Sequence, residues 1–279
     1  MRRNQLGSAL RELRRASGKE AKAVARSAAM SAMSASKVGK IETGKLAPSV
    51  VDVQSILMAI GVSDEVMAEY MEVARIAATE VIAWRLLART GPYRGQQQVQ
   101  ALDRQMRLLR LFQPALVPGL LQTPAYISAV VSRHGLTPDA HARMLAARMD
   151  RQHVLHDDAK QLRFIITESV LRWRIAPPDV MAEQMERLIS VSHLPRVDIR
   201  VVSQTAPQRD FPSHSFVIRD ERLVTVETVH AELVVTDPRD IREYVEKFEG
   251  FFESALSGHA MRSTVETVRD EFLRERETG

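Results

Sequence analysis

The stretch Met33-Ser-Ala-Ser-Lys-Val-Gly-Lys-Ile-Glu-Thr-Gly-Lys-Leu-Ala-Pro48 decides the fold of the N-terminal part of the chain. At about 100° per residue, Val38 and Ile41 fall on one side of a short helix, and small or cationic residues fall on the other. Gly44 suits the position after the helix, because glycine enters the left-handed region without steric strain. The narrow apolar side can pack on a small domain, while the cationic side is free to meet a polyanion.

The start of this helix has two possible registers, because the tripeptide Met-Ser-Ala occurs twice in a row, at 30–32 and at 33–35. A serine hydroxyl can accept a free backbone N–H of the first helical turn. Either Ser31 or Ser34 can therefore cap the helix. The choice decides which side chains face outward, and the sequence leaves it open.

Further helices are expected on either side of the stretch. Leucines at helical spacing predict a first helix that ends near Gly18, and an alanine-rich second helix is expected over residues 20–29. Ser49 and Asp52 resemble the start of a capping box and lead into an apolar closing helix. A small-residue helix, a turn, a polar-faced helix and a closing helix together form the helix-turn-helix plan.

These residues carry a family resemblance. The run Lys37-Val-Gly-Lys-Ile-Glu-Thr-Gly-Lys45, with Leu10-Arg-Glu-Leu-Arg14 before it, resembles the XRE (lambda-repressor-like) helix-turn-helix regulators. The resemblance covers roughly residues 4 to 62 and implies an all-α head that binds operator DNA, in a regulator of transcription such as a repressor. The opposite charges of Arg14 and Glu42, at matching places in the family motif, predict an ion pair between the first helix and the recognition helix.

The expected DNA contacts fall into two groups. Serine hydroxyls exchange hydrogen bonds with base edges, and lysine donates to guanine O6 and N7 in the major groove. The base-contacting residues are expected to be Ser34, Ser36, Lys37 and Lys40. The phosphate-contacting residues are expected to be Lys22, Thr43 and Lys45.

The distribution of charge agrees with a DNA-binding head. The whole chain has a formal charge of +4. Residues 1–48 hold 11 Lys and Arg against 3 Asp and Glu, so this part carries +8 and the remaining residues carry −4. Positive charge is thus concentrated where phosphates would be met.

Composition excludes several other classes. The chain has no cysteine, which excludes disulfides, thiolate nucleophiles and zinc–thiolate sites. No apolar segment approaches the ~20 residues needed to span a bilayer, and no signal peptide is visible. Arginine outnumbers lysine 32 to 7, a bias typical of GC-rich bacterial genomes. We therefore expect a cytoplasmic bacterial protein with no membrane association and no cofactor.

The chain is expected to have two domains with a connector between them. The head spans residues 1–62, a helical connector spans 63–95, and the second domain spans 96–279. The connector helix is predicted from position 63 to about 88, and a Gly- and Pro-containing break at 90–95 ends it. Because regulators of this plan usually bind two half-sites, we expect a homodimer held by the connector helix or by the C-terminal helices.

The second domain is predicted to be a mainly helical α+β domain with a small sheet. A helix is expected over residues 99–112, followed by an irregular apolar loop. Further helices are expected over 137–156, 168–174, 178–193, 239–256 and 261–276. Strands are expected over 162–167, 197–203, 215–219 and 223–229.

This part also carries a resemblance. The run Val117-Pro-Gly-Leu-Leu-Gln-Thr123, with Arg151-Gln152 and the segment 164–168, resembles an uncharacterised C-terminal domain that often follows this type of head in high-GC bacteria. The resemblance implies a module that senses a ligand, binds a partner or oligomerises. Family members commonly carry a glutamate ahead of this run, and near that position this chain has Asp103.

The Leu116–Gln122 loop is a candidate binding loop, because proline and glycine keep an apolar run irregular and such loops often line binding sites. The alternative is a hydrophobic plug that closes the core. The residues expected to line a ligand or partner site are Val117, Gly119, Leu121 and Gln122.

No catalytic or metal site is expected, and we expect a protein that is not an enzyme. His153 and His156 are spaced to share a helix face, but the spacing supplies no further metal ligand. Glu168, at a strand-to-helix junction, is expected to satisfy backbone amides at the start of its helix. Two functions remain: a sequence-specific transcriptional regulator that senses a ligand or partner, or an antitoxin-like protein that holds a small co-encoded partner and binds DNA for autoregulation.

Overall fold

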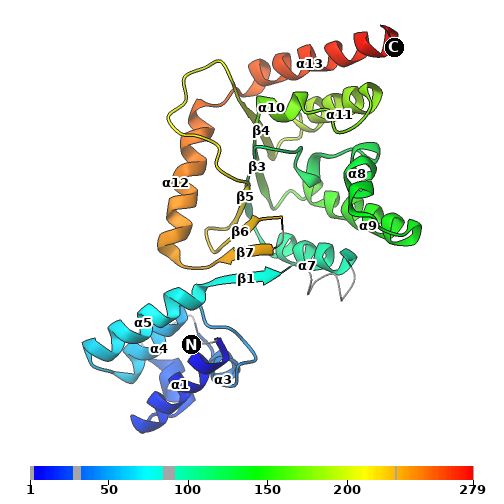
Figure 1. Ribbon diagram of the computed structural model, residues 1–279. Coiled ribbons are helices and arrows are strands. Elements are labelled where there is room, and N and C mark those ends of the chain that lie inside the picture. The colour runs from blue at the N-terminus through cyan, green and yellow to red at the C-terminus, as the bar shows by residue number, and fades with distance from the viewer. Residues whose placement is uncertain (1–2, 28–32, 84–91, 230, 279) are drawn as a thin grey trace. The chain divides into compact units, whose positions relative to one another are not determined.

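The computed structural model describes residues 3–27, 33–83, 92–229 and 231–278 (Figure 1). The chain divides into two compact units. The first comprises residues 1–81 with 234–241, and the second comprises residues 82–233 with 242–279. Ser31, one of the two serines that could cap the recognition helix, lies outside the described residues. Residues 84–91 of the expected connector also lie outside them.

The first unit is built of helices, as the sequence predicts. Its helices are α1 (Arg3–Ala16), α2 (Ala21–Arg26), α3 (Ala35–Glu42), α4 (Val50–Ile60) and α5 (Asp64–Ala78). They enclose one small core, in which the fully buried side chains include Leu10, Val38, Ile41, Val53, Ile56 and Leu57. The apolar sides of α1, α3 and α4 meet there, so the narrow apolar stripe of α3 is enough to anchor it.

Close packing and side-chain hydrogen bonds fix the helices of the head. A Cβ atom added to Gly7 would lie 2.2 Å from the carbonyl oxygen of Ile41, so only glycine allows α1 to approach α3 this closely. Asp52 and Ser49 form the predicted capping box at the start of α4, because each side chain accepts a hydrogen bond from the other residue's backbone N–H. Lys19 donates to the Ala59 and Ile60 carbonyls at the other end of α4.

The expected connector helix is only partly present. Helix α5 ends at Ala78, and β1 (Thr79–Ala83) follows it, so the prediction of a helix through residues 79–83 is wrong. Thr79, Val81 and Ile82 are β-branched residues, which fit a pleated strand better than a helix. Because the helix ends at Ala78, only α5 remains a candidate for the dimer seam that was expected along the connector helix.

The second unit contains most of a mixed sheet and of the remaining helices, while residues 234–241, at the end of β7 and the start of α12, belong to the first unit. Its strands are β2 (Leu108–Gln113), β3 (Gln161–Thr167), β4 (Val197–Val202), β5 (Phe216–Arg219), β6 (Leu223–Glu227) and β7 (Ala231–Val235). Its helices are α7 (Pro92–Gln105), α8 (Pro124–Val131), α9 (Pro138–Arg151), α10 (Glu168–Arg172), α11 (Pro178–Val191), α12 (Pro238–Ser254) and α13 (Gly258–Thr278). Short 3₁₀ turns lie at η2 (Gly119–Leu121), η3 (Ser132–His134) and η4 (Gln152–His156). This is the mainly helical α+β domain that the sequence predicts.

The strand order of the sheet is β1-β7-β6-β5-β2-β3-β4. Strands β2, β3 and β4 are parallel, and helices connect them along the chain. Strand β5 pairs antiparallel with β2, and β6 pairs antiparallel with β5. The four predicted strands are all present, and β1, β2 and β7 extend the sheet beyond them.

The prediction of one helix over residues 99–112 is wrong. The helix in this region, α7, ends at Gln105, and β2 begins at Leu108 in a central position between β3 and β5. The helical stripe in the sequence arose because a central strand buries residues on both faces, so its apolar side chains need not alternate. Helix α7 begins at Pro92, inside the expected break at 90–95, because proline suits the first turn of a helix.

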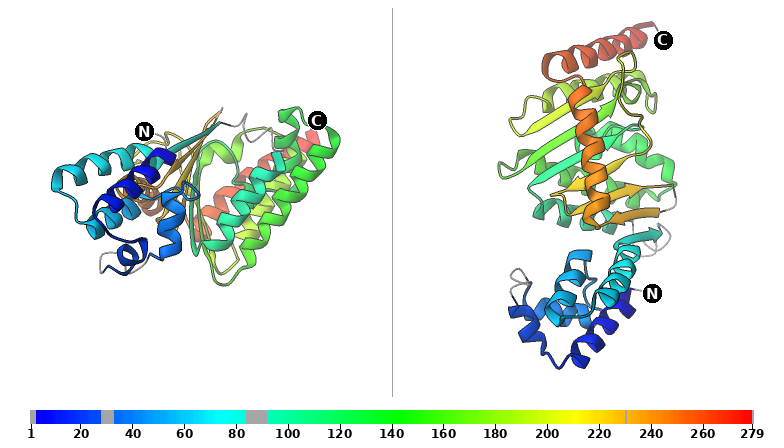
Figure 2. Two further views of the ribbon diagram at one scale, coloured as in Figure 1. Left: turned by 90° about the horizontal axis from the view of Figure 1, so that it is seen from below. Right: turned by 90° about the vertical axis from the view of Figure 1, so that its left-hand side faces the viewer.

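Helices lie on both faces of the sheet in the second unit (Figure 2). On one face, α8, α11 and α13 pack over a core that contains Leu121, Phe164, Ile166, Met185 and Val265. Helix α12 runs across the other face, where the ring of Phe251 stacks on Phe112 with centroids 4.7 Å apart. Among the described residues, no helix is long and apolar enough to cross a membrane.

Candidate nucleic-acid interface and effector cavity

The recognition helix α3 separates its residues by face. Val38 and Ile41 are completely buried in the head core. Ser34, Ser36 and Lys40 are exposed on the other side. The helix therefore presents hydroxyls and an ammonium group in a form that base edges can reach.

Ser34 caps this helix and so determines its register. Its side chain accepts a hydrogen bond from the Lys37 backbone N–H at 3.2 Å. At the other end Gly44 has a φ of +71°, and its N–H donates to the Ile41 carbonyl. With Ser34 as the cap, Ser36 and Lys40 belong to the outward face.

Lys37 is placed differently from the other expected base readers. Its Nζ lies 2.7 Å from Oδ1 of Asp52, and the Asp52 carboxylate is almost completely buried. This carboxylate also accepts the Ser49 N–H, so one acid both caps α4 and holds Lys37. The Lys37 ammonium would have to leave this ion pair in order to reach a base.

The residues expected to hold phosphates lie on the surface. Lys22 on α2 and Lys45 just after α3 are exposed. Thr43 is exposed as well, and its hydroxyl donates to the Gly39 carbonyl at 2.7 Å. The Thr43 hydroxyl would have to leave this hydrogen bond in order to donate to a phosphate.

Arg14 and Glu42 form the ion pair that the sequence predicts. Arg14 Nε donates to Glu42 Oε1 at 2.5 Å, and its terminal nitrogen donates to Oε2 at 2.8 Å. The hydrogen bond to Glu42 is the largest cause that raises the pKa of Arg14 above its ordinary value. The Glu42 side chain is 5% exposed, so this two-point contact ties α1 to the end of α3 inside the head.

In the second unit, three glutamines hold the Leu116–Gln122 loop in place. Gln122 donates to the Val117 carbonyl, and Gln152 donates to the carbonyls of Gly119 and Gln122. Gln184 accepts the Thr123 N–H and donates to the Leu121 carbonyl. These amides satisfy backbone groups that an irregular buried loop cannot pair within itself.

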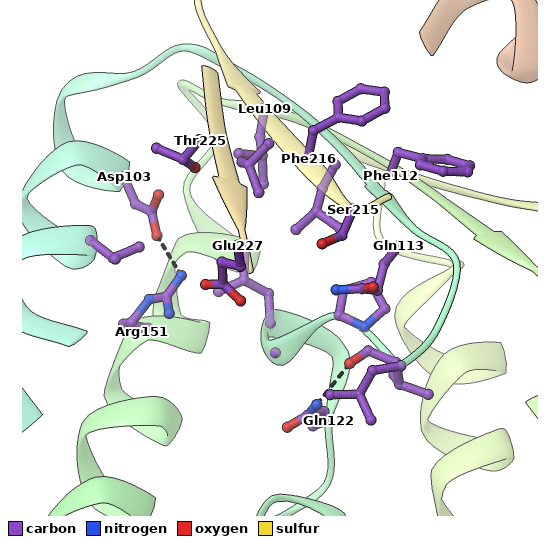
Figure 3. Close-up of a pocket in the computed structure, with 18 of the residues that line it drawn as sticks. Asp103, Leu109, Phe112, Gln113, Gln122, Arg151, Ser215, Phe216, Thr225 and Glu227 are labelled. Atoms are coloured by element: carbon purple, nitrogen blue, oxygen red, sulfur yellow. Dashed lines mark hydrogen bonds and ion pairs between the residues drawn. The ribbon is translucent and has the colours of Figure 1, made fainter. Parts of the chain in front are cut away.

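The loop closes the core and also borders a cavity. Leu120 and Leu121 are buried in the main core, as the plug interpretation expects. Beside the loop lies a cavity of about 140 Å³, which is lined in part by Val117, Gly119 and Gln122 (Figure 3). Leu121 is not among its lining residues, so this expected site residue serves the core instead.

Polar groups of the cavity wall gather around one buried carboxylate. Asp103 lies 3.1 Å from Arg151 and 3.0 Å from Arg219 and is 4% exposed. Arg151 also donates to Gln96 Oε1 at 2.6 Å, and Arg219 donates to the Thr225 hydroxyl at 3.2 Å. Asp103 is thus shared by two guanidinium groups.

Arg148 completes this side of the cavity. Its only hydrogen bond among the described residues runs to the neutral Gln122 Oε1, at 3.4 Å. Burial is the largest cause that lowers the pKa of Arg148, and repulsion from Arg151 lowers it further. Glu227 acts in the opposite sense on both arginines.

Two glutamates are also part of the cavity wall. Glu227 on β6 and Glu232 on β7 both line it. Burial first, and then the neighbouring Glu227, raise the pKa of Glu232 above its usual range. In Figure 3, Asp103, Arg151 and Glu227 point toward one another.

Sequence reasoning found only part of this cavity. The loop, Asp103 and Arg151 carry family motifs, but nothing marked Arg148, Arg219 or the two glutamates. In the sequence, Arg148 could have been found from its spacing alone, because it lies three residues before Arg151 on the same helix. The other groups come from strands that are distant in sequence.

The remaining candidates are His153 and Glu168. His153 is 84% exposed and lies 3.8 Å from Asp150, and no group of three or more His, Cys, Asp or Glu among the described residues could hold a metal ion. Glu168 accepts from the Gln204 N–H and the Ser203 hydroxyl. It therefore binds the loop after β4 and not the first amides of its own helix.

A helical head with a capped, polar-faced α3 defines a DNA-binding regulator of the helix-turn-helix class. A family model described as a helix-turn-helix domain matches residues 5–70, which confirms the resemblance to the XRE type. A second model, described as a domain of unknown function (DUF5753), matches residues 96–267. Because this match covers more than half of the chain, the chain belongs to the DUF5753 family.

Other comparisons add little to this assignment. The chain is similar to a phospholipase D family member, Nuc from Salmonella typhimurium, at 14% identity over 64% of this chain and 97% of that one, with a TM-score of 0.34. It is also similar to phosphatidylserine synthase of Haemophilus influenzae, at 12% identity over 80% of this chain and 54% of that one, with a TM-score of 0.35. TM-scores this low carry no functional argument. Comparison with curated proteins gave no match.

Proposed function

We propose that this chain is a sequence-specific transcriptional regulator whose α3 enters the major groove of operator DNA. One observation carries the proposal: Ser34 fixes a register in which Ser36 and Lys40 are exposed, opposite the buried Val38 and Ile41. Hydroxyl and ammonium groups on one exposed helix face suit the donor and acceptor pattern of the major groove. Lys22 and Lys45 are then the phosphate contacts on either side.

The test is selection of duplexes from a random DNA library by the full-length protein. The proposal predicts enrichment of one motif, and it predicts that Lys40→Ala loses discrimination at particular base pairs of that motif. Arg107, an exposed arginine on the second unit, supplies a control, because Arg107→Ala leaves the motif unchanged. Binding without any enriched motif would refute sequence-specific recognition.

We further propose that the regulator acts as a homodimer. One head of about 60 residues covers few base pairs, and paired half-sites about one helical turn apart give the affinity that a single head lacks. Helix α5 and the C-terminal helices α12 and α13 are the candidates for the seam. Light scattering of the free protein and of its DNA complex checks this, and a monomer in both states would contradict it.

In this proposal the DUF5753 domain senses a ligand or a partner and acts by binding, without catalysis. The support is the cavity beside the Leu116–Gln122 loop, whose wall carries both arginines and glutamates. Native mass spectrometry of the purified protein separates the two versions. A co-purifying small molecule favours a sensor, and a co-purifying small polypeptide favours the antitoxin-like alternative.

A further inference from the structure

The cavity of the second unit has an unusual feature on its α9 side. Arg148 and Arg151 lie one helical turn apart and both line it. The Nε atoms of both side chains are buried, and neither has a hydrogen-bond partner among the described residues. An unpaired buried donor is unfavourable, and a charged one more so.

The charges nearby do not satisfy these donors. The Asp103 carboxylate is already shared by Arg151 and Arg219. Arg148 has no carboxylate within ion-pair distance in the described part of the chain, and its one hydrogen bond goes to the neutral Gln122. Arg148 and Arg151 therefore both line the cavity, but only Arg151 pairs with a carboxylate, which it shares with Arg219.

The other side chains that line the cavity, together with its volume, limit the polarity and the size of a ligand. Apolar side chains line the cavity beside the arginines, among them Leu109, Leu116, Val117 and Leu120. The cavity volume of about 140 Å³ is close to that of an engineered protein cavity that holds benzene. The occupant must be small, with a short apolar body.

We propose that this cavity binds a small organic acid, with its carboxylate on Arg148 and Arg151 and its apolar body against the Leu116–Leu120 side. A carboxylate has two oxygens that can accept from two guanidinium groups, and charge-assisted hydrogen bonds of this kind are strong. Glu227 and Glu232 line the same cavity, so an acid that also carries an ammonium group finds carboxylates for it. The inference rests on the proposed sensing function and names the ligand class for that site.

Binding is tested on the full-length protein without DNA. The probes are carboxylates from acetate to octanoate, benzoate, and the apolar amino acids, each paired with its neutral amide. Arginine Nε–H signals in NMR spectra and the thermal unfolding midpoint report binding. The expected result is that at least one acid shifts two buried Nε–H signals and raises the midpoint, while its amide does neither.

Variants assign the effect to this cavity. Arg148→Gln should weaken binding of that acid about tenfold or more, and Arg148→Lys, which keeps the charge, should weaken it less. Arg143→Gln, at an exposed position on the same helix, should bind like the unaltered protein. Tighter binding of an amino acid than of the acid without its amine would assign the ammonium group to the glutamate side.

Three results would overturn the inference: no acid binds, acid and amide bind alike, or Arg148→Gln binds as well as Arg143→Gln. Motif selection on DNA is measured separately. If no acid binds and the protein still selects an operator motif, only this inference fails. If an acid binds and no motif is selected, the proposed DNA recognition fails and the cavity assignment stands.

Discussion

The recognition helix α3 and the Leu116–Gln122 loop are both short, and both depend on a few side chains that pair with the backbone. In α3, one serine cap and one glycine end a regular helix, and the outward residues stay exposed. In the loop, the side chains of Gln122 and of the distant Gln152 and Gln184 replace the hydrogen bonds that a regular element would make for itself. Residues close together in sequence thus fix the exposed face of α3, whereas residues from distant parts of the chain form the cavity.

The largest effect is expected from breaking the ion pair that ties α3 to α1. Glu42→Ala leaves Arg14 unpaired and should lower the free energy of unfolding of the head by about 3–5 kcal/mol. Native-state hydrogen exchange of α1, α3 and α4 amides measures this in the full-length protein. Glu12→Ala, at an exposed acid on α1, is the control, and an equal loss in both variants would contradict a stabilising ion pair.

A second large effect is expected in the loop. Gln184→Ala leaves the Thr123 N–H and the Leu121 carbonyl without their side-chain partners and should destabilise the second unit by about 2–3 kcal/mol. The matched control is Glu183→Ala, an exposed neighbour on the same helix. Hydrogen exchange should show the loss in the loop and α8, and a loss spread equally over the head would contradict this assignment.

A smaller effect is expected at Asp52, which caps α4 through the nearby Ser49 N–H and also pairs with the more distant Lys37 on α3. Asp52→Asn keeps a side-chain cap for α4 but releases Lys37 and removes a negative charge beside α3. DNA binding should become tighter by about 0.5–1 kcal/mol, the usual size of a partly exposed ion pair. Fluorescence anisotropy at constant salt checks this. Weaker binding would mean that the Lys37–Asp52 pair itself positions α3 on DNA.

The smallest effect is expected at Lys45. Lys45→Ala removes one phosphate contact, so it should reduce the slope of log affinity against log salt by about one ion and weaken binding to all sequences alike. Affinities for the selected motif and for a scrambled duplex, each over a range of salt concentrations, test this. A loss confined to the motif would place Lys45 at a base instead.

The sequence predicted the head well because its signals are local. Ser34, Gly44 and the Ser49–Asp52 box act within a few residues of their own positions, and the structure contains all three features. The choice between the two possible caps was the one local question that remained. Composition could not answer it, because the tandem repeat offers the same three residues twice.

The second unit was predicted less completely because its structure depends on pairing between distant strands. Residues 108–113 carry a helical stripe, but their place between β3 and β5 makes them a strand. The cavity depends on the same pairing, since α9 supplies Arg148 and Arg151 while β5 and β6 supply Arg219 and Glu227. The periodicity of one segment does not show which distant strands and helices will lie beside it.

The most direct test of the central claim is the base preference of Ser36→Ala and Lys40→Ala, measured by selection from a random duplex library. If α3 reads bases in the register that Ser34 fixes, each variant will lose preference at its own one or two base pairs of the motif and keep the rest. If both variants select the motif of the unaltered protein with undiminished preference at every base pair, α3 does not read DNA through this face, and the account is wrong.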